Sequence, residues 1–347
     1  MLFRSRYVSS DRLSFYVAGM VAIIVICQIV QVFRAITIFK ECHIVCRHWF
    51  DRSKYKAIST FASWNLFGAF GVLFRDQGSA ILLNLFFGPN MNAAYGIATQ
   101  ISAQTNQLSN AMIGAIAPEI TASEGRGERE RMLSLSQRAS KFGTLLVLFL
   151  SIPLIVEMDY VLILWLHEPP PFTALFCQFI LLTFLVDRLS TGYMLAVQAH
   201  GRIALYQATV GTSLLLTLPL AWLLLKAGLA PTSIGFAFVA TMTITSLGRV
   251  LWGKYLFDIP IFLWLLKVVW PCVIVALVAT VAALVPHYML SPSFLRLFLV
   301  TSFSLLSSLI ITWFFALDEK ERSFVGESVQ RIFCRLGIRG SILHKPK

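Results

Sequence analysis

The chain has 347 residues, of which 57% are hydrophobic and only 13% are charged. A soluble domain of this length would carry about a quarter charged residues, so the composition excludes an ordinary soluble protein. The formal net charge of +12 would indicate nucleic-acid binding in a soluble chain, but a membrane protein uses basic residues for topology.

Nine apolar runs approach the roughly 20 residues that an α-helix needs to cross a bilayer. The sequence therefore predicts an all-α fold, a polytopic transmembrane helical bundle of about nine spans. The runs cover residues 13–33, 59–88, 91–117, 142–165, 172–199, 203–226, 232–256, 262–285 and 294–317.

The basic residues of the loops are distributed asymmetrically. If the C-terminus is cytoplasmic, basic residues occupy the inner segments 34–58, 118–141, 200–202, 254–261 and 318–347. The outer loops 89–90, 157–171, 227–231 and 286–293 contain neither lysine nor arginine. This pattern satisfies the positive-inside rule, and nucleic acid is unnecessary as a partner.

The beginning of the chain departs from that rule. Arg4, Arg6 and Arg12 precede the first span, and nine spans with an inner C-terminus place them outside. The apolar run 13–33 is too long for a signal peptide, and no small-residue cleavage site follows it. We therefore expect that an N-terminal part is missing.

The second and fifth predicted spans each contain charges near their middle. Arg75, Asp76 and Gln77 interrupt the second span, and Asp187 and Arg188 interrupt the fifth. Each intramembrane charge costs at least about 2.5 kcal/mol unless it is paired or hydrated. Adjacent helical residues point about 100° apart and are not expected to pair. Two interpretations remain: cross-helix pairs (Arg75 with Asp187, or Arg188 with Asp76), or an anion site for a substrate that crosses the membrane.

The predicted span 91–117 has a polar face, which spans an arc of about 160° on a helical wheel. Such a face must meet protein or water, because unsatisfied polar groups in hydrocarbon cost several kcal/mol each. Hydrogen bonding between helices is one interpretation, but the number of polar residues favours a water-filled cavity. The face comprises Asn92, Thr99, Gln100, Gln104, Asn106, Gln107 and Asn110.

No pattern in the sequence indicates an enzyme or a cofactor. The histidines are scattered, and no Gly-x-x-x-x-Gly-Lys nucleotide loop occurs. The basic connector 34–58 has interleaved aromatic residues, which suit either an anionic inner leaflet or a solvated loop. Within it, the spacing of Cys42, His43, Cys46 and His48 is not a standard zinc pattern.

Several motifs, taken together and in order, resemble polysaccharide (O-antigen) flippases of the multidrug/oligosaccharidyl-lipid/polysaccharide exporter superfamily. The resemblance runs from about residue 40 to residue 260, and the stretch after "FFGP" is its most specific part. The motifs are "FASWNLFGAFG", "ILLNLFFGPNMNAAYGIATQIS", "AIAPEITASEGRGERE", "SIPLI" before "ILWLHEPPP", and "VQAHGRIALYQ".

The resemblance implies two six-helix lobes that face each other across a cavity. Residues 59–256 look like the complete C-terminal lobe, and 262–317 like two additional transmembrane helices. Residues 1–58 would be the last helix of an incomplete N-terminal lobe plus the connector, and 318–347 a basic cytoplasmic tail. Most of the N-terminal lobe is therefore expected to be absent, which puts independent activity in doubt.

The function implied by the resemblance is flipping of an undecaprenyl-pyrophosphate-linked oligosaccharide across the bacterial inner membrane, for lipopolysaccharide or other polysaccharide export. Arg75 and Arg188, at similar depth and facing the same side, would meet the pyrophosphate. Asp76 and Asp187 would neutralise them in the empty site or carry a coupling proton, with Gln77 alongside. Sugar hydroxyls would meet the amide face, including Gln100, Gln104, Gln107 and Asn110.

The expected partners are the lipid-linked oligosaccharide, anionic membrane lipids and the polysaccharide polymerase machinery. One alternative is a multidrug or cation exporter of the same superfamily, for which we expect cavity acids without arginine partners. Another is a non-transporting membrane remnant or scaffold.

Overall fold

The computed structural model describes residues 12–38, 52–319, 321–323 and 326. These residues form helices and connecting turns without a strand, which confirms the predicted all-α class. The chain divides into two compact units, Met1–Ser59 and Thr60–Lys347. The cysteines and histidines of the connector 34–58, the early Arg4 and Arg6, and most of the basic tail lie outside the described residues.

The first unit contains α1 (Arg12–Ile38) and the first residues of α2 (Arg52–Phe87). The 24 residues Phe15–Ile38 are long and apolar enough to cross a membrane, in agreement with the first predicted span. Their side chains are almost all exposed, so α1 has an apolar surface suited to lipid.

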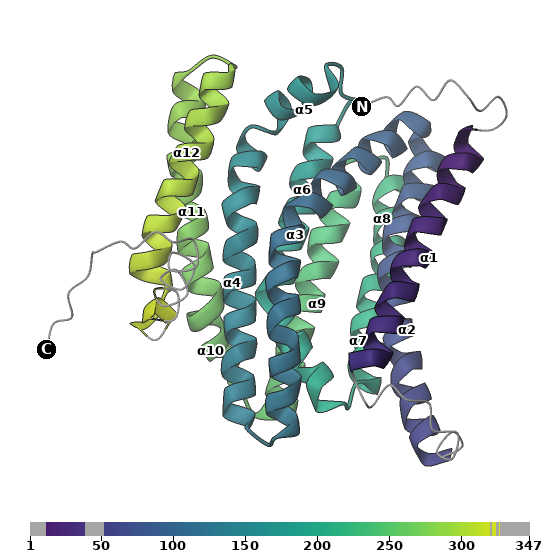
Figure 1. The fold of residues 1–347 in the computed structure, drawn as a ribbon. Coiled ribbons are helices and arrows are strands. Elements are labelled where there is room, and N and C mark those ends of the chain that lie inside the picture. The colour runs from purple at the N-terminus through teal and green to yellow at the C-terminus, as the bar shows by residue number, and fades with distance from the viewer. Residues whose placement is uncertain (1–11, 39–51, 320, 324–325, 327–347) are drawn as a thin grey trace, which may run out of the picture. The chain divides into compact units, whose positions relative to one another are not determined.

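The second unit is a set of long helices that run side by side (Figure 1). Two π-helical turns, Leu265–Val269 and Thr312–Ala316, lie before α11 and after α12. After α2 the helices are α3 (Pro89–Gly125), α4 (Arg129–Val156), α5 (Met158–Leu166), α6 (Thr173–His200), α7 (Ala204–Leu215), α8 (Thr217–Lys226), α9 (Ser233–Phe257), α10 (Ile261–Trp264), α11 (Trp270–Met289) and α12 (Phe294–Ile311).

Within the described ranges, eight helical segments are long and apolar enough to cross a membrane. The predicted span 91–117 is not among them, although it lies inside the 37-residue helix α3. The polar residues of α3 lower its hydropathy below that of a lipid-facing helix. The polar residues seen in the sequence therefore distinguish α3 from the eight apolar segments.

One predicted boundary is wrong. The sequence predicted a span over 142–165, but α4 covers 129–156 and α5 is a separate helix of 9 residues. The chain turns at Glu157, whose backbone N–H is bonded to the Pro153 carbonyl and whose carboxylate contacts Arg296 and His287. The break between α4 and α5 therefore coincides with an acidic residue that has partners far away in the chain.

Glycine permits the closest helix contacts of the second unit. A Cβ atom at Gly192 of α6 would overlap the carbonyl oxygen of Ser136 in α4, and the Gly192 N–H donates to Ser140 Oγ at 2.8 Å. Likewise, a Cβ atom at Gly71 of α2 would lie 3.1 Å from the carbonyl oxygen of Gly211 in α7. Small residues at such crossings let backbones approach, which stabilises helix pairs in membranes.

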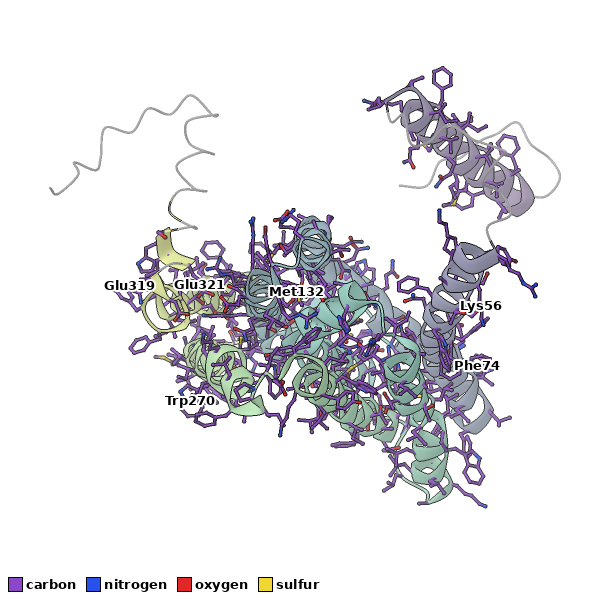
Figure 2. The ribbon with its side chains drawn as sticks, turned by 90° about the horizontal axis from the view of Figure 1, so that it is seen from below. Lys56, Phe74, Met132, Trp270, Glu319 and Glu321 are labelled. Carbon is purple, nitrogen blue, oxygen red and sulfur yellow. The ribbon has the colours of Figure 1, made fainter. Side chains whose placement is uncertain are left out.

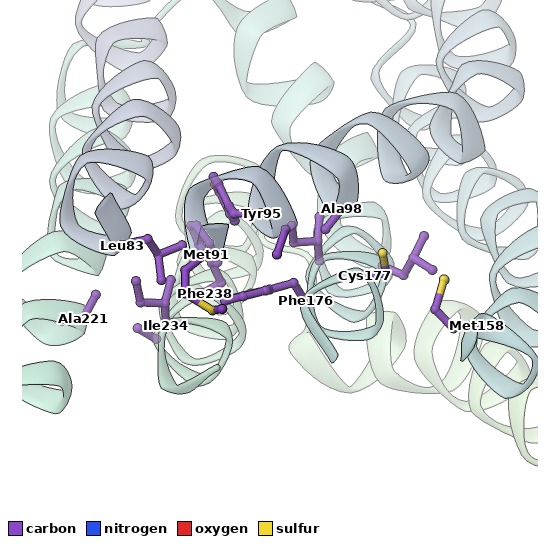
Figure 3. Packing of buried hydrophobic residues seen from close by; sticks show 14 of the residues in the cluster. Leu83, Met91, Tyr95, Ala98, Met158, Phe176, Cys177, Ala221, Ile234 and Phe238 are labelled. Carbon is purple, nitrogen blue, oxygen red and sulfur yellow. The ribbon is translucent and has the colours of Figure 1, made fainter. Parts of the chain in front are cut away.

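The central helix of the second unit is α6, which packs against α3, α4 and α9. Its apolar core includes Tyr95, Phe176 and Phe238, which Figure 3 shows close together. The rings of Tyr95 and Phe238 are stacked, with centroids 6.1 Å apart. Because lipid tails are as apolar as these side chains, their tight packing contributes more to helix association than their removal from lipid.

Candidate functional site

A pocket of about 230 Å³ opens where α2, α3, α6 and α9 meet. Tyr95 and Phe238 contribute aromatic walls, and Thr99 and Thr183 contribute hydroxyl groups. Most of the exposed lining is apolar, and the charged groups come from α2 alone. The pocket therefore has one charged end and an aromatic body.

Arg75 and Asp76 form that charged end. The Arg75 Nε atom lies 2.8 Å from Asp76 Oδ1, and the side chains are 10% and 39% exposed respectively. The prediction that adjacent residues could not pair is therefore wrong. The 100° separation applies to the Cβ directions, whereas the long arginine side chain bends back to its neighbour. Gln77 is exposed and does not line the pocket.

The Arg75 guanidinium also lies over the ring of Phe238, 5.3 Å from its centroid. Such a cation–π contact holds the planar group in a fixed orientation. Only Nε is hydrogen bonded, and the two terminal nitrogens have no partner among the described residues. Arg75 is therefore positioned by Asp76 and Phe238 while it keeps donors for an anion.

The other predicted charges have partners that the sequence did not identify. Asp187 Oδ1 accepts a 2.7 Å hydrogen bond from Arg249 Nη1 of α9, and Arg188 Nη2 donates to Asn110 Oδ1 of α3 at 2.7 Å. The predicted pairs of Arg75 with Asp187 and of Arg188 with Asp76 do not form. Arg249 lies within the predicted span 232–256. A charged residue inside an apolar span was therefore the sequence signal that could have identified Arg249 as a partner.

Arg188 does not line the Arg75 pocket. The pocket beside Arg75 uses α6 residues 180–184, whereas Arg188 stands further along the same helix. On α3 the pocket ends at Ala103, seven residues before Asn110, or about 10 Å at 1.5 Å per residue.

The predicted polar face of α3 divides into an exposed part and a buried part. Gln100, Gln104, Gln107 and Asn110 are exposed, and the predicted water-filled cavity beside them stays a prediction. Asn106 instead is buried, with its Nδ2 atom bonded to the Ser102 carbonyl, and its Oδ1 atom has no partner in the described part of the chain.

A further buried donor lacks a partner near this face. Arg188 Nε has no hydrogen-bond partner among the described residues, and it lies 4.0 Å from Asp187 Oδ2. Buried polar atoms are normally satisfied by protein or by ordered water. Arg188 Nε and Asn106 Oδ1 therefore both have unused hydrogen-bonding capacity among the described residues.

Two ion pairs that no sequence pattern indicated join α4 to the C-terminal part of the chain. Glu157 contacts Arg296 at 2.7 Å, and Lys141 contacts Glu321 at 2.7 Å. Glu157 follows the last residue of α4, and Lys141 lies near the middle of α4, one residue before the predicted span 142–165. Charges at such positions are common in membrane proteins, so sequence alone gave no reason to pair them.

The fold and these charges define a multi-pass α-helical membrane protein. The described residues contain no cluster of histidine, cysteine and acidic side chains that could hold a metal ion. Comparison with known protein families, curated proteins and solved structures finds no match for the chain.

Proposed function

We propose that the chain takes part in moving a lipid-linked oligosaccharide with an anionic phosphate linkage across a bacterial inner membrane, for polysaccharide or O-antigen export. The observation that carries the proposal is Arg75, which is held at a pocket with its terminal donors free. Arginine remains charged in a poorly hydrated site and binds phosphate oxygens through a planar fork.

The exposed amides of α3 support a substrate that carries sugars. Gln104 and Gln107 offer both donors and acceptors without charge, as binding of sugar hydroxyls requires. Such amides are costly against lipid, so their exposure requires water, substrate or another protein segment over α3. The resemblance in sequence motifs to polysaccharide flippases favours the same substrate, with polysaccharide polymerase machinery and anionic lipids as partners.

A multidrug or cation exporter is less well supported. A cation site would use an acidic residue whose charge is not already neutralised. In the pocket, Asp76 is paired with Arg75 at 2.8 Å, so the pair has no net charge for a cation. An anion can use the free terminal donors of the Arg75 guanidinium, whereas a cation must compete with that arginine for Asp76.

Binding by the purified full chain tests the proposed substrate. We expect saturable binding of an undecaprenyl-pyrophosphate-linked oligosaccharide and about 10- to 100-fold weaker binding by Arg75→Gln, because charge-assisted hydrogen bonds contribute about 1.5–3 kcal/mol. The matched control is Arg202→Gln, an exposed arginine outside the pocket. Equal binding of an oligosaccharide linked to uncharged undecaprenol would contradict the proposal.

We also propose that the C-terminus is cytoplasmic and that the loop 157–171 faces outward, because loop lysines and arginines after residue 33 fall on the inner side. Impermeant thiol labelling of intact cells tests this orientation. Cys42, Cys46 and Cys334 should react only after lysis. Strong labelling of Cys334 before lysis would reverse the orientation.

A further inference from the structure

A second pocket, of about 200 Å³, lies where α4 meets the π-helical turn before α11 and the segment that follows α12. It shares no lining residue with the Arg75 pocket. Its exposed lining is mainly polar. Charged side chains from three separate parts of the chain meet there: Arg138, Lys141, Lys267, Asp318 and Glu321.

Two of these charges neutralise each other in the wall of the pocket. Lys141 Nζ lies 2.7 Å from Glu321 Oε2, and the two side chains are 5% and 7% exposed. The same carboxylate oxygen accepts the backbone N–H of Asp318 at 3.0 Å. This pair has no free charge and serves as a fixed polar wall that joins α4 to the segment after α12.

Two cations of the pocket have no such partner. Arg138 is partly buried and Lys267 is exposed, and neither has an ion pair or side-chain hydrogen bond within the described ranges. Because the Lys141–Glu321 pair is neutral, the net charge of the pocket comes from Arg138, Lys267 and Asp318. The pocket therefore has one net positive charge. That charge matches a monoanionic phosphodiester.

The surroundings of the pocket are apolar and exposed. Lys267 belongs to the π-helical turn Leu265–Val269, and the second π-helical turn, Thr312–Ala316, precedes Asp318. Trp270, directly after the first turn, and Phe315, within the second turn, have exposed side chains. Figure 2 shows Trp270 and Glu321 on the same side of the second unit. Isolated π-helical turns often occur at functional sites.

We infer that this pocket binds the phosphate of an anionic phospholipid. Arg138 supplies a planar fork for two phosphate oxygens and Lys267 a compact positive charge. The acyl chains then lie along the exposed apolar side chains of α11 and α12, in the arrangement typical of basic lipid pockets beside transmembrane helices. Inorganic phosphate shares the charge chemistry but makes no use of this apolar surface. The inference requires only a membrane location, not the proposed translocation.

Lipid titration of the purified full chain tests the inference, with bound lipid counted by native mass spectrometry. We expect phosphatidylglycerol to bind more tightly than phosphatidylcholine. The double variant Arg138→Gln/Lys267→Gln should weaken phosphatidylglycerol binding about 30-fold, since each basic residue contributes about 1 kcal/mol and 1.4 kcal/mol is tenfold.

The matched control is Arg202→Gln/Lys254→Gln, which removes the same charge from exposed positions outside the pocket and should change binding less than about threefold. An equal loss in both double variants would overturn the inference, as would equal binding of phosphatidylcholine. Displacement of the lipid by millimolar inorganic phosphate would identify free phosphate as the ligand instead. The pocket variant should keep the wild-type unfolding temperature, because its two cations have no protein partner, and a large decrease would contradict that premise.

Discussion

Glu157 at the end of α4 and two arginines inside the bundle, Arg75 and Arg188, have their hydrogen-bonding groups satisfied to very different degrees. At one end of α4, Glu157 is fully buried and both of its oxygens are used. Oε2 accepts from Arg296 Nη2 at 2.7 Å and Nε at 3.2 Å, and Oε1 lies 2.8 Å from His287 Nδ1. Within the bundle, Arg75 keeps both terminal nitrogens free and Arg188 Nε has no hydrogen-bond partner in the described chain.

The difference distinguishes charges that hold the fold from charges available to a ligand. A buried ion pair with all its hydrogen bonds made is costly to break but leaves nothing for a substrate. An arginine with unused donors contributes less to folding and is available to bind. Substitution of individual charged residues should distinguish the two kinds of charge by the loss of stability that it causes.

Glu157→Gln should destabilise the protein most, by about 3–5 kcal/mol, because it leaves the Arg296 guanidinium buried against a neutral group. Unfolding of the purified chain in detergent measures the loss. Glu168→Gln is the control, since Glu168 is exposed on the same side of the membrane bundle. If Glu157→Gln unfolds like the control, Glu157 does not anchor α12.

Asp187→Asn should cost about 2–4 kcal/mol, because it leaves the Arg249 guanidinium without its 2.7 Å carboxylate partner. Replacing both residues by leucine should recover most of the stability, since removing both partners of a buried pair is often nearly neutral. The same unfolding assay measures both variants. Failure of the double variant to recover would mean that the pair has a further structural partner.

Glu124 should make a small, pH-dependent contribution to stability. The hydrogen bond from Arg129, followed by the contact with His200, holds the pKa of Glu124 below its usual value. A carboxyl group with a lowered folded-state pKa stabilises the fold above its unfolded pKa, and this stability disappears as the pH falls from about 4.5 through the folded value.

Because Arg129 is half exposed, the contribution of Glu124 should stay below about 1 kcal/mol. Unfolding measured from pH 6 to pH 3 should show a shallower acid dependence for Glu124→Gln than for the wild type. Glu130→Gln is the control, because Glu130 is exposed and outside this cluster. Identical acid profiles for Glu124→Gln and the wild type would contradict the assignment.

Hydropathy predicted the helical class and most spans because a long apolar run has few alternatives in a bilayer. It could not predict the interruption at Glu157, which depends on partners 130 and 139 residues away in the chain. The charged positions themselves were visible in the sequence, since Arg75 and Asp187 interrupt apolar runs. The partners of these charges were not visible in the sequence. They depend on the conformation of each arginine side chain and on which helix faces meet, and both are set by the packing of the bundle.

The contact at Gly192 has a mechanical consequence. The backbones of α4 and α6 are in direct contact there, so the two helices cannot slide past each other without a clash. Ion pairs of Glu157 and Lys141 connect α4 to the C-terminal part of the chain. These helices should therefore move as one rigid frame. Of the helices that line the Arg75 pocket, α6 belongs to this frame, so a change in the width of the pocket should come from movement of α2, α3 or α9.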